Sequence, residues 1–270
     1  MLITRIITAS ILALSLGFLL FLGTPLMWQM FFLLVVFTIG YEWSGFAGIN
    51  TLVDKLIWGA MFLLSIILLD YLFLNIAFFD ALLFVPLALM VLFVVLFQRN
   101  KGLKLLTNSY AIFLLGVVII YAFYYALISL KMNVSSQIIL LSFFIIWAVD
   151  VGAYFAGKQF GKTKLASYVS PGKTWEGVFG GILLSAIIAY FGLIFIEPQT
   201  NLSYFALSIV LSVIGALSIF GDLFESFLKR QAGMKDSSQL LPGHGGVLDR
   251  TDSIILAMPL FLLIWQSVSI

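Results

Sequence analysis

Long apolar runs separated by short polar segments make up most of the chain. One helical crossing of a bilayer needs about 20 consecutive, mostly apolar residues, and nine stretches of the sequence approach or reach that length. The predicted spans are residues 6–23, 27–46, 56–75, 80–98, 108–129, 136–156, 175–196, 202–224 and 250–269. The pattern therefore predicts an all-α fold, a polytopic transmembrane bundle of about nine helices.

Basic residues fall almost entirely in alternate loops between these spans. Thirteen of the 14 Lys and Arg residues share a side with the N-terminus, and only Lys131 lies on the other side. Because cytoplasmic loops of membrane proteins are enriched in Lys and Arg, this asymmetry places the N-terminus and the loops after spans two, four, six and eight in the cytoplasm. The C-terminus is then expected outside.

Composition agrees with a membrane protein and excludes several kinds of site. Hydrophobic residues make up 63% of the chain and the mean hydropathy is +1.17, which is more apolar surface than a soluble core of this size could bury. A net charge of +2 gives no reason to expect nucleic acid as a partner. The absence of cysteine excludes disulfides, a thiolate nucleophile and Cys-based metal sites.

Polar chemistry is concentrated in the second half of the chain, where 16 of the 26 charged residues lie from Asp150 onward. Residues 1–135 are predicted to be N-terminal scaffold helices. Residues 136–270 are predicted to be a catalytic transmembrane region with cytoplasmic loops, in one integral membrane unit. No internal repeat or soluble domain is evident.

The segment 221–252 carries nine charged residues in 32 positions. On a helix that begins near Leu202, four side chains spaced i, i+3, i+4 and i+7 share one polar face: Asp222, Glu225, Ser226 and Lys229. Asp249 and Asp252 return at the start of the next span, so two groups of carboxylates enter one region. Carboxylates that converge without Cys or a second His suit a hard cation such as Mg²⁺. Glu225 with Lys229 is expected to be an ordinary surface pair.

The same segment offers groups that suit phosphate. Positive charge comes from Lys229, Arg230, Lys235 and Arg250. The Gly245–Gly246 pair allows backbone N–H groups to approach a phosphate closely. His244 is the only histidine, and the sequence leaves open whether it contacts substrate or anchors the backbone.

A second polar segment runs from Asp150 to Gly177. Asp150 closes an apolar run, so its carboxylate either reaches the interface or meets a cation. Ser170 and Pro171 predict a helix start, with an N-cap followed by Pro, and Lys173 in its first turn favours an anion there. The alternative is a well-capped helix in a loop that is basic for topological reasons. Together the two segments predict a cytoplasm-facing Mg²⁺ site for phosphorylated substrates, one of them a lipid.

The two segments also resemble a known family. The run from Ser226 to Asp252, with LPGHGGVLDRTD at its end, resembles the C-terminal signature of the phosphatidate cytidylyltransferases, the CDP-diacylglycerol synthases. The run SPGKTWEG at residues 170–177 resembles a second block of that family. The resemblance covers roughly residues 145–265.

The resemblance implies transfer of a cytidylyl group from CTP to phosphatidate, which gives CDP-diacylglycerol and pyrophosphate with Mg²⁺ and room for a second cation. By matched position it implies metal ligands at Asp222 and Asp249, with Glu225, Asp252 and Asp150 as additional ligands, and catalytic roles for Asp222, Asp249, Lys229 and Arg230. It implies substrate-binding roles for Ser170, Lys173, Thr174, Glu176, Lys235, Asp236, His244, Gly245, Gly246 and Arg250.

The sequence leaves two other functions open, a CTP-dependent polyprenol kinase and a transporter of phosphorylated lipid or nucleotide. The expected partners are CTP, phosphatidate and the bilayer, in the inner membrane of a bacterial cell and without nucleic acid. Small residues such as Gly177 and Gly181 permit close helix contacts, and a homodimer is among the partners considered.

Overall fold

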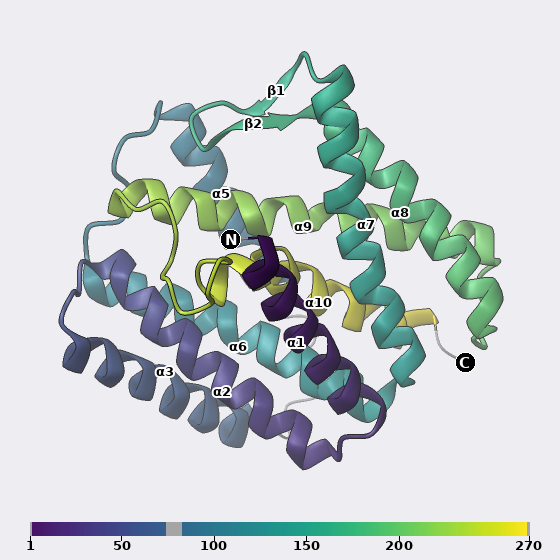
Figure 1. Ribbon diagram of the computed structural model, residues 1–270, viewed down its shortest axis with the longest axis horizontal. Coiled ribbons are helices and arrows are strands. Elements are labelled where there is room, and N and C mark those ends of the chain that lie inside the picture. Colours follow the sequence, from purple (N-terminus) through teal and green to yellow (C-terminus); the bar gives the residue numbers. More distant parts are fainter. Residues whose placement is uncertain (1, 74–82, 269–270) are drawn as a thin grey trace.

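The computed structural model describes residues 2–73 and 83–268, and its nine α-helices correspond one to one with the predicted spans (Figure 1). The span ends expected at residues 75 and 80 lie outside the described residues. The helices are α1 (Leu2–Phe21), α2 (Pro25–Trp43), α3 (Leu52–Phe73), α5 (Phe84–Arg99), α6 (Ser109–Asn133), α7 (Ser136–Phe160), α8 (Trp175–Ile196), α9 (Tyr204–Ala232) and α10 (Leu248–Val268). A 3₁₀ turn, η1 (Ser44–Ala47), follows α2, and an antiparallel hairpin of β1 (Lys164–Ala166) and β2 (Ser170–Thr174) joins α7 to α8.

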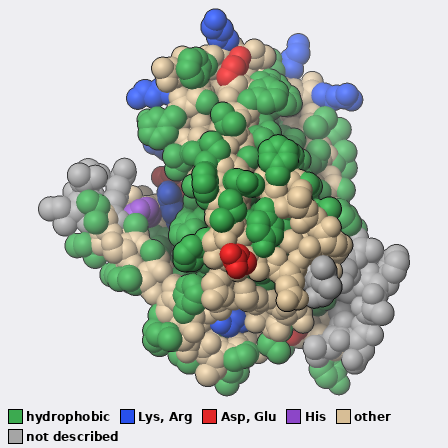
Figure 2. Space-filling model, turned by 90° about the vertical axis from the view of Figure 1, so that its right-hand side faces the viewer, with side chains coloured by type: hydrophobic (Ala, Val, Ile, Leu, Met, Phe, Trp, Pro, Cys, Tyr) green, Lys and Arg blue, Asp and Glu red, His purple; other side chains and the backbone are tan. Residues whose placement is uncertain are grey.

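The helices form a multi-pass membrane protein. Seven of those described are long and apolar enough to cross a membrane, while the apolar part of α1 (Ile6–Phe21) and α5 are shorter. The face in Figure 2 is covered mainly by hydrophobic side chains, and several Lys and Arg side chains lie at its upper end. An apolar flank bounded by charge is the surface that a bilayer requires.

Hydrogen bonds between loops and helix ends fall into two groups, one at each end of the bundle. At one end, three of the alternate loops and residues near the N-terminus are joined by hydrogen bonds from Thr8 to Pro242, from Gln98 to Ser167, and from Gln231 to Leu103. At the other end, the carbonyl of Leu20 accepts from Lys131 and Ser136, and Asn201 donates to Val268. For the described loops that make these contacts, the grouping agrees with the alternation expected for successive crossings.

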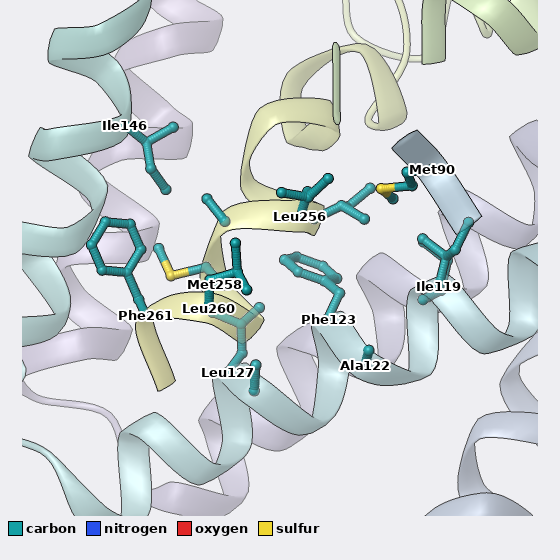
Figure 3. Packing of buried hydrophobic residues seen from close by; sticks show 14 of the residues in the cluster. Met90, Ile119, Ala122, Phe123, Leu127, Ile146, Leu256, Met258, Leu260 and Phe261 are labelled. Carbon is teal, nitrogen blue, oxygen red and sulfur yellow. The ribbon is translucent and has the colours of Figure 1, made fainter. Parts of the chain in front are cut away.

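Helix α10 lies at the centre of the core. Its side chains Leu256 and Leu260 are buried beside Phe123 and Leu127 of α6 (Figure 3). Since α6 belongs to the N-terminal half and α10 to the C-terminal half, the two halves share one hydrophobic core.

The small residues of α8 serve contacts within the chain. A Cβ atom on Gly152 of α7 would lie 2.6 Å from the carbonyl oxygen of Gly180, and one on Gly181 would lie 2.8 Å from that of Val149. Glycine is thus needed for the close packing of α7 against α8. The face of α8 that carries Gly177 and Gly181 is occupied by this contact.

The predicted helix start at Ser170 and Pro171 is wrong. Both residues lie in β2, where Ser170 pairs with Ala166, and α8 begins five residues after Ser170. Thr174 is the actual N-cap: its backbone is extended and its hydroxyl accepts from the amide of Gly177 at 3.2 Å. Pairing with β1 holds the segment extended until Thr174, which offers a second competent capping hydroxyl.

Candidate active site

One pocket of about 480 Å³ opens between α7, the hairpin, α8 and α9. Helix α7 contributes a continuous stripe to it, spaced i, i+3, i+4, i+7 and i+8: Asp150, Ala153, Tyr154, Gly157 and Lys158. The other sides are formed by β2, α8 and α9. The pocket therefore combines an apolar wall with a few charged groups, as sites for amphiphilic ligands do.

Lys173 and Asp222, which both line this pocket, form an ion pair. The Nζ atom of Lys173 is 2.7 Å from Oδ2 of Asp222 and donates to the carbonyl of Ile219 at 3.2 Å. The side chains keep 22% and 36% of their exposure, so both remain accessible to a ligand. The pair connects β2 to α9, which are the two segments that the sequence singled out.

Two further carboxylates lie close to this pair. Asp150 of α7 and Asp252 of α10 both interact electrostatically with Asp222 and Lys173. Gly221 allows α10 to approach, because a Cβ there would collide with the backbone of Asp252. Three helices, α7, α9 and α10, thus each contribute one carboxylate whose charge acts on the ammonium group of Lys173.

Asp150, Asp222 and Asp252 supply oxygen donors suited to a hard cation, but their side chains are not placed closely enough to coordinate one. Within residues 2–73 and 83–268, no three His, Cys, Asp or Glu side chains are placed so as to hold a metal ion. The oxygen donors of Asp150, Asp222 and Asp252 are those that Mg²⁺ prefers, and the ammonium of Lys173 neutralises part of their charge. A cation at this position would therefore compete with Lys173 for Asp222.

Glu225, Lys229 and Asp249 form a separate, buried group. Lys229 Nζ lies 2.6 Å from Oε2 of Glu225 and 2.9 Å from Oδ1 of Asp249, with side-chain exposures of 17%, 4% and 7% respectively. The expected pairing of Glu225 with Lys229 is present, but its expected surface position is wrong. The reason is that α10 covers this face of α9, which brings Asp249 onto the same ammonium.

Asp249 is further held by the backbone around it. It accepts from the amide of Gly246 at 2.8 Å and from that of Ser237 at 3.1 Å. Gly245 has φ +84°, and a Cβ there would lie 2.6 Å from Oδ2 of Asp249. The Gly245–Gly246 pair therefore lets the loop pack closely against Asp249. The amide of Gly246, which was expected to approach a phosphate, donates to Asp249 instead.

His244 and Arg250 close a turn in the same loop. Arg250 donates from Nε and Nη2 to the carbonyl of His244, at 2.9 and 2.7 Å, and the amide of His244 donates to Leu241. The backbone of His244 is thus an anchor, one of its two expected roles. Its Nδ1 atom is buried without a hydrogen-bond partner among the described residues.

The other residues expected to bind substrate, and Arg230, which was expected to be catalytic, lie outside the pocket or support the fold. Arg230, Lys235 and Asp236 are exposed and make no ion pair with a described residue. Glu176 accepts from the amide of Thr163 and fixes the hairpin to α8. Thr174 lines the pocket, but its hydroxyl is bonded to Gly177.

Comparison with known proteins identifies the family. The model of the family described as "Cytidylyltransferase family" matches residues 3–268. The chain belongs to the cytidylyltransferase family. Proteins named phosphatidate cytidylyltransferase are similar to it: that of Haemophilus influenzae is 49% identical over 128 residues, 46% of this chain and 44% of that relative. That of Pseudomonas aeruginosa is 42% identical over 160 residues, 57% of each chain. The matched region spans about half the length of these curated relatives.

Three residues of this cytidylyltransferase-family chain contribute to the site or to its support although the sequence analysis did not predict them. Lys158 lines the pocket, and its spacing of i+8 from Asp150 on one helical face was a usable signal. Gln98 binds the amide of Tyr168 and the hydroxyl of Ser167, which fixes the hairpin that carries Lys173. Glu42, a lone carboxylate in an apolar helix, is 2% exposed, and such a group is costly in a membrane unless it has partners.

Proposed function

We propose that this chain transfers the cytidylyl group of CTP to phosphatidate, giving CDP-diacylglycerol and pyrophosphate. The observation that carries the proposal is the match of nearly the whole chain to the cytidylyltransferase family, combined with a pocket that holds Lys173 and Asp222. The relatives named phosphatidate cytidylyltransferase indicate the lipid acceptor. A pocket that opens between membrane helices suits a substrate with both a phosphate and acyl chains.

The reaction needs one new bond and one broken bond at phosphorus. A phosphate oxygen of phosphatidate attacks the α-phosphorus of CTP in line, and the bond from that phosphorus to the bridging oxygen of the β-phosphate breaks, so that pyrophosphate leaves. The lipid phosphate carries negative charge at neutral pH, so it is already a competent nucleophile and needs no general base. The work left to the protein is positioning and neutralisation of charge.

Lys158 and Lys173 are the cations that line the pocket, and we assign them to the phosphate groups. Lys173 is held by Asp222 and the carbonyl of Ile219, which keeps its ammonium inside the pocket. Tyr154 and Val178 border the same space and would keep water from the reacting phosphates. Helix α7 thus supplies both a cation and an apolar wall.

We further propose that Mg²⁺ binds among Asp150, Asp222 and Asp252. When bound, the metal would stabilise negative charge on the transferred phosphate and on pyrophosphate. Asp249 and Glu225 were also expected as metal ligands. They could bind the metal only if their ion pairs with Lys229 were broken. A second cation would need further oxygen ligands, which Glu225 and Asp249 could supply only without their bonds to Lys229.

The position of the labelled phosphate in the product tests the proposed reaction. We expect purified protein with phosphatidate and Mg²⁺ to move the label of α-labelled CTP into lipid, and to release the label of γ-labelled CTP as pyrophosphate. Transfer of the γ label to an added polyprenol would instead identify a kinase. Absence of transfer from either nucleotide would also overturn the proposal and would leave transport as the remaining function.

We propose that the protein lies in the bacterial inner membrane with this pocket facing the cytoplasm, where CTP is available. The basic residues gathered in alternate loops support this orientation. Because the chain has no cysteine, single variants Gln199→Cys and Gln239→Cys, both at exposed positions, form a matched pair on opposite ends of α9. In intact cells, an impermeant thiol reagent should label position 199 and spare position 239. The reverse pattern would contradict the orientation.

A further inference from the structure

The carboxylate of Glu42 joins the two ends of the loop between α9 and α10. Although Glu42 lies on α2, about 200 residues away in sequence, its oxygens accept from the hydroxyls of Ser237 at 3.1 Å and Ser238 at 2.6 Å. They also accept from the amides of Val247 at 2.8 Å and Leu248 at 2.7 Å. One buried side chain thus holds the beginning and the end of the same loop.

The amides of Val247 and Leu248 belong to the start of α10, where backbone N–H groups have no partner inside the helix. A side chain just before the helix usually satisfies these groups. Here the acceptor is a carboxyl group supplied by α2, at the end of the helix where negative charge is favoured. Glu42 therefore caps the first turn of α10.

The loop is built to receive this carboxylate. A Cβ atom on Gly246 would lie 2.6 Å from Oε1 and 2.7 Å from Oε2 of Glu42, so any larger residue would push the carboxylate away. Ser237 connects Glu42 to the next group, because its amide donates to Asp249 while its hydroxyl donates to Glu42. A continuous chain of hydrogen bonds and ion pairs runs from Glu42 through Ser237 and Asp249 to Lys229.

We propose that Glu42 is a positioning residue for the transfer reaction: it sets the register of α10 and thereby places Asp249 and Asp252. The N-terminal half of the chain then contributes directly to the geometry of the active site. This proposal rests on the proposed function for its kinetic consequence. Glu42 does not line the pocket, whereas Lys158 and Lys173 do, so substrate binding should depend on it less than turnover does.

Two readouts on the Glu42→Gln variant test this role. Gln has nearly the same size as Glu, but its amide nitrogen cannot accept hydrogen bonds. The variant therefore loses the hydrogen bonds that one of the two carboxylate oxygens accepts from the loop. A spin label on Gln239→Cys should become clearly more mobile, and kcat per folded molecule should fall at least about 10-fold with less than about threefold change in KM for CTP. Ser237→Ala, which removes one of the four bonds to Glu42 and keeps the amide bond to Asp249, should change both in the same direction but less.

Glu197→Gln is the matched control, because it makes the same change at an exposed carboxylate between α8 and α9. It should alter neither readout. If Glu42→Gln only lowers the amount of folded protein, with label mobility and kcat per folded molecule unchanged, the positioning role is refuted. If the unchanged chain shows no cytidylyl transfer, the proposed function fails instead, and label mobility still decides whether Glu42 holds the loop.

Discussion

Asp222→Asn should lower the rate of cytidylyl transfer at least 100-fold, which corresponds to about 2.7 kcal/mol in the activation barrier. Asn keeps the size of the side chain but removes the charge that holds Lys173 and that we assign to the metal. The Mg²⁺ concentration needed for half-maximal rate should be higher for the variant than for the unchanged protein. Stability should change little, because the Lys173–Asp222 pair is partly exposed and such pairs are worth at most about 1 kcal/mol.

Initial rates across a range of Mg²⁺ concentrations, with folded protein quantified in each preparation, measure this effect. Asp54→Asn is a suitable control because Asp54 is an exposed carboxylate in the first turn of α3, bonded only to Thr51 among the described residues. It should behave like the unchanged protein. A normal rate and normal Mg²⁺ dependence in Asp222→Asn would remove Asp222 from the site, and Asp150 with Asp252 would become the pair to test.

Lys229→Met should lower the free energy of unfolding by about 3–5 kcal/mol, the usual cost of removing one partner from a buried ion pair. Met fills a similar volume, but Glu225 and Asp249 would face each other without the intervening ammonium. Oε1 of Glu225 already has no hydrogen-bond partner among the described residues, so the environment offers this carboxylate little further compensation.

Reversible unfolding of the purified protein in mixed detergent micelles measures this loss. Arg230→Met provides a matched control in the adjacent position, since Arg230 is exposed and forms no ion pair with a described residue. Its effect should stay within about 0.5 kcal/mol. Equal effects of the two substitutions would show that the buried group does not stabilise the fold.

Hydropathy alone was enough to predict the helices, because the bilayer imposes a minimum length of apolar sequence on each crossing. The polar face of α9 followed from helical spacing, and Asp222, Glu225 and Lys229 do lie on one continuous helix. The sequence could not separate Asp222 from the other two. That separation depends on which neighbouring element contacts each turn of α9: strand β2 brings Lys173 to Asp222, and helix α10 brings Asp249 to Lys229.

Two features of the site depend on contacts that the sequence does not encode locally. The hairpin overrides the strong N-cap signal at Ser170 because backbone pairing with Ala166 has its own hydrogen bonds. Glu42 was read as part of a scaffold, since its partners lie about 200 residues away and two of them are backbone amides. Its cost as a lone carboxylate in a membrane helix was the one signal available.

The most direct test of cytidylyl transfer at the Lys173–Asp222 pocket is the transfer of α-labelled phosphate from CTP to phosphatidate, measured side by side in the unchanged protein and in Asp222→Asn. We expect the label in the lipid of the unchanged protein and a rate at least 100-fold lower in the variant, with equal amounts of folded protein. Label transfer at the same rate in both would contradict a reaction at the Lys173–Asp222 pocket, and γ-label in the lipid would contradict cytidylyl transfer itself.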